Sequence, residues 1–330
     1  MKVLLVCMEH AYGDATRPKS YEYFSFYLSL QGIGHDVELF DFMVQTRLNG
    51  KQAMNDLLLA RVLEWHPDLV MFSLYQDDFE SSTIDTLRKH TKTLCFFHDD
   101  TWRVDFTRYW APHFDFFTTP DVYGEAKYRS IGLTNAIYFP FGCNETIFRP
   151  LDVPVSHDVS FVGAWHPARQ WLIEQVGRRG YRVEAFGYRW PKGELDLEQM
   201  VALFNSSKIN LNLSNSASWD ARYLLSSPRG LINRFRSPKT VEQIKGRYFE
   251  ISGSGAFQLA AYVEGLERLF AIGAEIGIFV DLDDLLRKID HYLLAEEERA
   301  AISDAALRRT LNDHTFRHRF EETFARMGLT

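Results

Sequence analysis

The sequence has no long hydrophobic run and no closely paired cysteines. No stretch approaches the roughly 18 uninterrupted apolar residues that a membrane-crossing helix needs. The short apolar run at the N-terminus meets acidic and glycine residues too early for a signal peptide. Of the three cysteines, Cys7 and Cys95 fall inside apolar runs, which predicts buried, reduced thiols. These absences predict a cytoplasmic protein.

Positive charge is not in excess either. The chain carries 37 Lys and Arg residues against 44 Asp and Glu residues, for a formal net charge of −7. A protein that coats nucleic acid needs basic charge spread over its surface, although a local basic patch remains compatible with this balance. We therefore expect no nucleic-acid partner.

Several common catalytic motifs are missing. The sequence has no GxxxxGK[ST] loop, no GxGxxG after its first strand pattern, and no HExxH, GxSxG or Cys/His cluster. One acidic run, with Asp281, Asp283 and Asp284, suggests either a divalent metal site or the cap of the amphipathic helix that follows. We expect the cap, because acidic side chains are favourable at a helix N-terminus, and we expect no cofactor and no metal.

What is present is a repeated α/β pattern over 330 residues. A single core stops growing near about 250–300 residues, so two domains are expected. Apolar strand patterns alternate with helix patterns up to about residue 140 and restart after a polar, proline-containing linker at 141–158. This predicts an α/β fold of two Rossmann-like domains, 1–150 and 151–330, facing each other across a cleft, with ligands at the carboxyl ends of the strands.

The most informative segment contains two glutamates, Glu242 and Glu250, with Lys245 and Arg247 between them. On a continuous helix, predicted here over 240–252, the glutamates stand two turns plus about 80° apart. A nucleotide sugar offers hydroxyls to carboxylates and a diphosphate to cations. The alternative is an amphipathic helix with the ion pairs Glu242–Lys245 and Arg247–Glu250, and spacing alone leaves both interpretations open.

Three C-terminal segments are distinctive: KGRYFEISGSGAFQLAAYVEGLERLF, GAEIGIFVDLDDL and HTFRHRFEETF. By these segments, and by weaker matches over nearly the whole chain, the sequence resembles the CgeB-like glycosyltransferases, which are GT-B enzymes related to glycosyltransferase family 4. The resemblance implies a metal-independent glycosyltransferase of hexosyltransferase type that moves a sugar from a nucleoside-diphosphate sugar to an acceptor, with retention of configuration. It also implies that the last helix can pack back on the N-terminal domain.

The resemblance assigns roles to residues of the second domain. Glu242 and Glu250 match its E-x7-E motif, in which Glu242 would contact the donor sugar and Glu250 the ribose hydroxyls. Arg169, after the first strand of that domain, would contact the diphosphate. The other residues implied in donor binding are Gly163, Lys245, Arg247, Gly253, Ser254 and Gly255.

In the first domain, a strand pattern ends in His98, Asp99 and Asp100. An imidazole or carboxylate at that edge could accept a proton from the acceptor or stabilise developing positive charge, so we expect a catalytic role for this group. The alternative is a cap of the following turn. If the strand stays regular, His98 and Asp100 share one side and Asp99 points to the other.

Two further segments carry expectations. Tyr12 and Gly13, with His10, lie in the first loop and could border the acceptor, although packing at the domain edge would also explain Tyr12. The segment Ser216–Ser237 is polar and basic without an apolar period, with four arginines. It could form a lid over the donor, a flap that contacts a membrane surface or polymer, or a disordered loop.

Two other function classes remain open. One is a nucleotide-sugar epimerase of GT-B-like fold, which would turn over its donor without an acceptor. The other is a non-catalytic nucleotide-binding protein. The sequence specifies neither the acceptor nor the oligomeric state.

Overall fold

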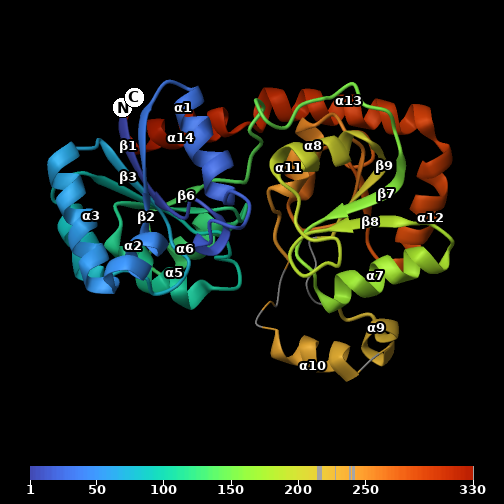
Figure 1. The fold of residues 1–330 in the computed structure, drawn as a ribbon, viewed down its shortest axis with the longest axis horizontal. Coiled ribbons are helices and arrows are strands. Elements are labelled where there is room, and N and C mark those ends of the chain that lie inside the picture. The colour runs from blue at the N-terminus through green and yellow to red at the C-terminus, as the bar shows by residue number, and fades with distance from the viewer. Residues whose placement is uncertain (214–217, 227, 238, 240–241, 330) are drawn as a thin grey trace. The chain divides into compact units, whose positions relative to one another are not determined.

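The computed structural model describes residues 1–213, 218–226, 228–237, 239 and 242–329. The chain divides into two compact units, one made of Met1–Pro140 with Phe316–Thr330 and the other of Phe141–Thr315 (Figure 1). The boundary therefore lies at residues 140/141, ten residues before the expected one, and the last helix belongs to the first unit.

The first unit contains a six-stranded parallel sheet in the order β2-β1-β3-β4-β5-β6. Its central strand β3 reads LVMFS and is buried along its whole length, as expected of a parallel strand covered on both faces. The strands are β1 (Lys2–Cys7), β2 (Asp36–Asp41), β3 (Leu69–Ser73), β4 (Lys92–Phe96), β5 (Phe116–Thr119) and β6 (Ala136–Tyr138).

Helices cover both faces of this sheet (Figure 1). On one face, rings from the π-helical turn Tyr23–Tyr27 and from the last helix pack together. The centre of the Phe26 ring lies 5.5 Å from that of Phe316 and 4.7 Å from that of Phe96. The other face carries a core cluster that includes Phe42, whose ring lies 5.2 Å from that of Phe79. The helices of this unit are α1 (Leu28–Gly32), α2 (Phe42–Asn49), α3 (Lys51–Trp65), α4 (Ser81–Leu87), α5 (Val104–Trp110), α6 (Gly124–Ser130) and α14 (Phe316–Met327).

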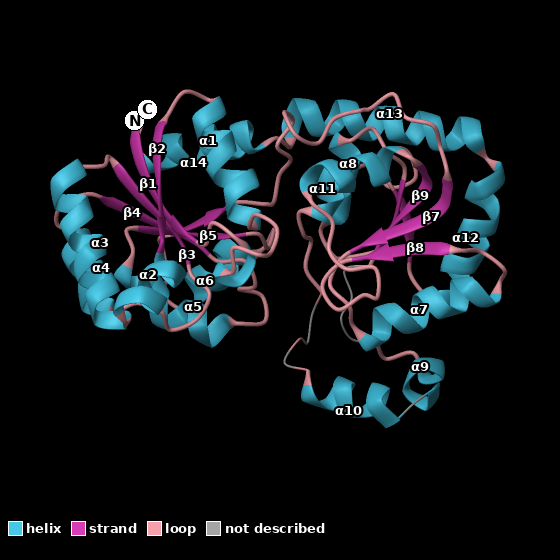
Figure 2. Ribbon diagram, in the orientation of Figure 1, coloured by secondary structure: helices cyan, strands magenta, loops and turns pink. Residues whose placement is uncertain are grey.

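The second unit contains a five-stranded parallel sheet in the order β11-β10-β9-β7-β8. Figure 2 shows α7 on one side of this sheet and α8 and α11 on the other. Its strands are β7 (His157–Val162), β8 (Val183–Phe186), β9 (Ser207–Asn212), β10 (Gln258–Ala261) and β11 (Gly277–Phe279). Its helices are α7 (Pro167–Arg178), α8 (Leu197–Asn205), α9 (Ala221–Ser226), α10 (Pro228–Arg236), α11 (Arg247–Gly253), α12 (Leu282–Leu294) and α13 (Glu296–Asp313).

Each sheet has a point where the chain reverses its direction of progress across the sheet. β1 pairs with both β2 and β3, and β7 pairs with both β8 and β9. The connections that leave these strands diverge, which opens a crevice at their carboxyl ends where α/β proteins bind ligands. The loop with His10 and Gly13 follows β1, and the loop with Gly163 follows β7, so both predicted loops lie at such points.

Several local predictions are confirmed. Cys7 and Cys95 are buried and free. Asp281 is the N-cap of α12, and its carboxylate accepts a hydrogen bond of 2.7 Å from the backbone N–H of Asp284. In the part of the chain that the structure describes, no helix is both long enough and apolar enough to cross a membrane.

One local prediction is wrong. The helix expected over 240–252 begins only at Arg247, and Glu242 lies in the irregular segment before it, while residues 240–241 fall outside the described part. In the segment Ser216–Ser237, for which a disordered loop was one of three alternatives, residues 221–226 and 228–236 form α9 and α10. Two signals for these helices were present, since the Asp220 carboxylate accepts from the Arg222 backbone N–H at 2.8 Å and Pro228 opens α10.

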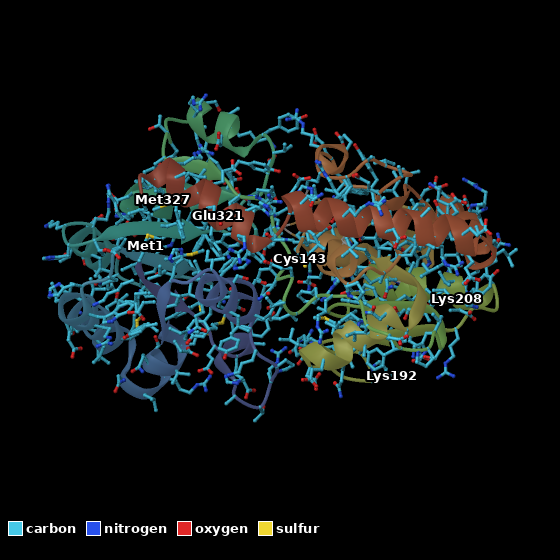
Figure 3. All side chains as sticks on the ribbon, turned by 90° about the horizontal axis from the view of Figure 1, so that it is seen from above. Met1, Cys143, Lys192, Lys208, Glu321 and Met327 are labelled. Carbon is cyan, nitrogen blue, oxygen red and sulfur yellow. The ribbon has the colours of Figure 1, made fainter. Side chains whose placement is uncertain are left out.

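The close contact between α11 and the segment after Pro140 gives a stability prediction. A Cβ on Gly253 would lie 2.3 Å from the Sγ atom of Cys143, which is labelled in Figure 3. Cys143 is fully buried. We expect Gly253→Ala to lower the free energy of unfolding by about 1–3 kcal/mol through overpacking. Urea denaturation measures this loss.

Gly177, exposed on α7 with open space around it, is the matched control. Gly177→Ala should stabilise the protein by about 0.5–1 kcal/mol, because alanine favours a helix more than glycine does. Adding Cys143→Ala to Gly253→Ala should recover part of the loss. Equal stability of both glycine variants would contradict the proposed contact.

Candidate functional site

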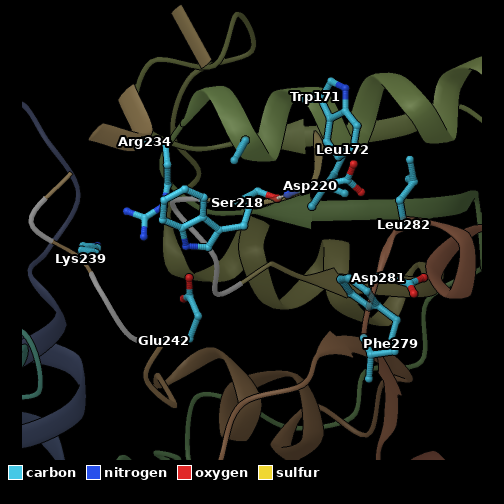
Figure 4. Close-up of a pocket in the computed structure, with 13 residues that line it drawn as sticks. Trp171, Leu172, Ser218, Asp220, Arg234, Lys239, Glu242, Phe279, Asp281 and Leu282 are labelled. Atoms are coloured by element: carbon cyan, nitrogen blue, oxygen red, sulfur yellow. Dashed lines mark hydrogen bonds between the residues drawn. The ribbon is translucent and has the colours of Figure 1, made fainter. Parts of the chain in front are cut away.

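A pocket of about 400 Å³ lies in the second unit, where β7 and β11 lead into their helices (Figure 4). Its walls come from the first turns of α7 and α12, from the segment around α9 and α10, and from the irregular segment before α11. The residues that line it are Ala168, Trp171, Leu172, Ser218, Trp219, Asp220, Arg234, Lys239, Glu242, Phe279, Val280, Asp281 and Leu282.

Local sequence explains why these elements meet. Pro167 is the first residue of α7, directly after the β7 loop. Trp171, one helical turn later, lines the pocket. Trp171 packs 5.6 Å from the buried ring of Tyr223 on α9, and Leu282 at the start of α12 joins the same cluster. Figure 4 shows Glu242 on the opposite side of the pocket from Trp171.

Three charged side chains that the sequence analysis singled out influence one another here. Burial lowers the pKa of Arg169 to about 10. The negative charge of Glu242 opposes this shift, and the positive charge of Arg247 adds to it. Burial also raises the pKa of Glu242 above its usual value, against the pull of Lys239 and Arg169. The structure therefore gathers Arg169, Glu242 and Arg247 in one electrostatic cluster, although Glu242 is not on the α11 helix.

Glu250 lies within the same cluster but is only 3% exposed. Burial raises its pKa, and the charge of Arg247 opposes the shift. The expected ion pair between Arg247 and Glu250 is present, and Arg247 Nη1 also lies 2.8 Å from Met200 Sδ. Folding raises the pKa of Glu250, so its ionised form lowers the free energy of unfolding at neutral pH. A carboxylate whose pKa is perturbed in this way is typical of functional sites.

The remaining predicted donor residues make packing contacts in the structure. The Gly163 carbonyl accepts a hydrogen bond of 2.9 Å from Trp190 Nε1. Ser254 is fully buried, and its hydroxyl donates to the Glu250 carbonyl at 2.9 Å. Gly255 has a φ of +67° beside Pro150. The ammonium group of Lys245 lies 5.6 Å from the centre of the Phe141 ring.

In the first unit, His98 joins a buried cluster at the carboxyl ends of β3 and β4. Its Nε2 lies 2.8 Å from Ser73 Oγ and 2.9 Å from Glu22 Oε1, and Ser73 donates to the same Glu22 oxygen at 2.8 Å. Burial opposes ionisation of Glu22, but the hydrogen bond and charge of His98 bring its pKa below the usual value. The sequence analysis missed Glu22, whose signal is a lone carboxylate inside the aromatic run YEYFSFY.

Asp100 does not share the surroundings of His98. It is 2% exposed, and its Oδ2 accepts a hydrogen bond of 3.0 Å from the Tyr128 hydroxyl on α6. The His98 ring instead lies 5.9 Å from Tyr21, on the face covered by α1 and α14. The predicted alternation fails because β4 ends at Phe96, and Asp99 lies in the turn that follows.

The predicted acceptor residues lie in the loop after β1. Tyr12 adopts a left-handed conformation with φ of 57°, and its half-exposed ring lies 5.6 Å from Tyr75 and 4.6 Å from the Arg17 guanidinium. Gly13 is buried with a φ of +66°, and a Cβ there would lie 2.8 Å from that of Met43. His10 forms an antiparallel bridge to Lys19, which closes the loop.

Solved structures with the same arrangement of elements are GT-B glycosyltransferases. Sucrose-phosphate synthase from Thermosynechococcus elongatus superposes with a TM-score of 0.66 at 12% identity, over 99% of this chain and 97% of that chain. A glycosyltransferase from Rickettsia africae superposes with a TM-score of 0.64 at 12% identity, over 98% of this chain and 97% of that chain. HepE from Anabaena, solved with UDP and glucose, superposes with a TM-score of 0.61 at 12% identity, over 100% of both chains.

Sequence comparison adds one finding. Residues 169–325 match a family model described as glycosyl transferase-like, and this stretch runs from Arg169 through both glutamates of the cluster. No curated protein matches the chain. The prediction of two parallel-sheet, Rossmann-like domains is confirmed, and the fold is that of GT-B glycosyltransferases.

The loop before α7 gives a prediction on pH. Burial, and then the charges of Arg169 and Lys239, lower the pKa of His166 to about 4. An unfolded histidine has a pKa near about 6.5. The unfolded chain therefore binds a proton that the folded protein does not, and the free energy of unfolding falls as the pH drops from about 6.5 towards 4.

His166→Asn should remove this contribution. Between neutral pH and pH 4.5, the wild type should lose about 1–2 kcal/mol more stability than the variant, after allowance for partial exposure of the ring. Urea denaturation of both proteins at a series of pH values measures the difference. Parallel curves for the two proteins would rule out a depressed pKa at His166.

Proposed function

We propose that this protein is a glycosyltransferase that moves a sugar from a nucleoside-diphosphate sugar to an acceptor hydroxyl without a metal ion and with retention of configuration. The observation that carries the proposal is the cluster of Arg169, Glu242, Arg247 and Glu250 beside a pocket at the carboxyl edge of the second sheet. The match to a glycosyl transferase-like family model and the CgeB-like resemblance support it.

The donor diphosphate would bind near Arg169. Burial and the neighbouring Arg247 disfavour the Arg169 charge, so an anion at this position would relieve an existing electrostatic cost. In the reaction, the bond between the anomeric carbon and the diphosphate oxygen breaks, and the electron pair leaves with the diphosphate. Arg169 would stabilise that charge, a task that GT-B sites perform with cations and helix dipoles.

The two glutamates would bind hydroxyls of the donor. Glu242 lines the pocket, where we assign it to the sugar, and Glu250 keeps its proposed role at the ribose. Raised pKa values mean that both carboxylates gain from new hydrogen-bond donors on ligand binding. Uridine diphosphate is the first probe to choose, because HepE was solved with UDP and with UDP-glucose.

His98 would act on the acceptor. With its proton on Nε2, which faces Ser73 and Glu22, the His98 ring would take up the acceptor proton on Nδ1. Glu22 would be a positioning residue that orients the ring and balances its charge. The acceptor oxygen would bond to the anomeric carbon on the face that the diphosphate leaves, which retains the configuration, and the hydroxyl proton would pass to this imidazole.

The donor site can be tested by calorimetry with UDP. We expect micromolar to millimolar affinity that EDTA does not change. Glu250→Gln should weaken binding by about 10- to 150-fold, since charge-assisted hydrogen bonds contribute roughly 1.5–3 kcal/mol. Its melting temperature at neutral pH should stay the same or rise, because ionised Glu250 is buried at a cost.

Glu198→Gln, an exposed glutamate in the first turn of α8, is the control and should bind UDP normally. A cycle with Arg247→Ala separates a direct contact from an effect through Arg247. If the double variant binds no worse than Arg247→Ala alone, Glu250 acts only by positioning that arginine. Loss of UDP binding in EDTA would overturn the metal-free proposal.

The acceptor side can be tested by transfer rates. His98→Ala should lower kcat about 10²- to 10⁴-fold, the usual loss for a general base, while UDP affinity stays within a few-fold of wild type. Glu22→Gln should lower kcat with little change in the donor KM, and Glu22→Asp should restore part of the rate. Product mass measures the transfer.

Asp100→Asn tests the original expectation for the strand end. A loss of kcat equal to that of His98→Ala would place Asp100 in the reaction, whereas a lower melting temperature with normal kcat would assign it to packing with Tyr128. Unchanged transfer by His98→Ala would reject a catalytic role for this cluster. Turnover of the donor by wild type without any acceptor would favour an epimerase.

A further inference from the structure

The outer face of α10 is apolar. Leu231, Ile232 and Phe235 are 44%, 51% and 73% exposed, and their spacing places them within about 100° of one another around the helix. The opposite side carries the buried Gly230, where a Cβ would lie 3.2 Å from the Tyr223 ring. α10 therefore turns its apolar side outward, the reverse of an ordinary surface helix.

An exposed aromatic residue extends this face. The Trp219 ring is 64% exposed and lies 6.3 Å from Phe235 in an edge-to-face arrangement. Trp219, Leu231, Ile232 and Phe235 are called the outer apolar face below. A tryptophan and a phenylalanine side by side on a surface are typical of residues that insert at the boundary of lipid headgroups and acyl chains.

Arginines border the outer apolar face on both sides. Arg234 precedes Phe235 and lies 3.9 Å from the centre of the Trp219 ring, and the exposed Arg236 follows on the other flank. These two arginines stand in a chain whose net charge is −7. Their charge complements an anionic surface, whereas the chain as a whole is acidic.

The face is held in place from behind. The buried Tyr223 packs against Ala168, Trp171 and Leu282, and Arg222 on α9 donates to Asp283 at 2.8 Å. These contacts anchor α9 and α10 to α7 and α12 through their inner sides. The apolar side chains therefore stay outward by packing, because the inner sides of the helices are already occupied.

We infer that α9 and α10 bind the surface of an anionic lipid bilayer. Leu231, Ile232 and Phe235 would enter the acyl boundary while Arg234 and Arg236 contact lipid phosphates, as in interfacial amphipathic helices. A purely apolar partner would not need the arginines on both flanks. The inference does not depend on the proposed transfer reaction, because its readout is vesicle binding and the residues changed in its test, Ile232, Phe235 and Arg236, do not line the pocket.

The test is co-sedimentation of the full chain with vesicles. Wild type should bind vesicles of phosphatidylcholine mixed with phosphatidylglycerol and bind pure phosphatidylcholine much more weakly, with affinity falling as salt rises. The double variant Ile232→Ser, Phe235→Ser should lose roughly tenfold or more in vesicle affinity, because lipid binding scales with the apolar area buried. Arg236→Gln should reduce the preference for the anionic vesicles.

The control is Leu48→Ser, which removes a 72% exposed leucine from α2 in the other unit and should bind vesicles as wild type does. Melting temperature and UDP affinity show that each variant is folded, since Ile232, Phe235 and Arg236 do not line the pocket. Equal binding to both vesicle types, or unchanged binding by the double variant, would overturn the inference. So would a wild-type dimer that the double variant abolishes while neither protein binds vesicles.

Discussion

The parallel pairing of β7 with both β8 and β9 is the constraint on which the second unit depends. Parallel strands bury both faces under helices, so polar side chains that must meet a ligand are left with the edges of the sheet. The reversal beside β7 brings the start of α7, the start of α12 and the segment before α11 to one carboxyl edge. The first unit repeats this arrangement at β1 and β3: the predicted acceptor loop follows β1, and Ser73, which contacts Glu22 and His98, is the last residue of β3.

Both edges hold charges that burial makes costly. Glu250 and Glu242 have raised pKa values, and Arg169 has a lowered one. Glu22 differs, because His98 and Ser73 supply enough hydrogen bonding to lower its pKa despite burial. One unit therefore holds a carboxylate whose hydrogen bonds outweigh its burial, and the other holds carboxylates and an arginine whose charged forms burial disfavours.

The helices α9 and α10 connect two features of the second unit. Their inner sides pack on α7 and α12, and Trp219 and Arg234 form part of the pocket wall. Their outer side carries the apolar residues bordered by arginines. Trp219 therefore belongs both to the outer apolar face and to the pocket wall.

Local patterns in the sequence determined much of this structure. Apolar runs specified the buried strands, Asp281 specified its helix cap, and spacing on a short helix specified the pair of Arg247 with Glu250, since each involves neighbours along the chain. The family resemblance assigned Arg169 and Glu242 to the same donor, and the structure has their charges influence each other. Only the tertiary structure decided that α11 begins after Glu242, that Glu22 reaches His98, and that Asp100 turns to Tyr128. Those outcomes depend on packing between segments distant in sequence, which no local periodicity encodes.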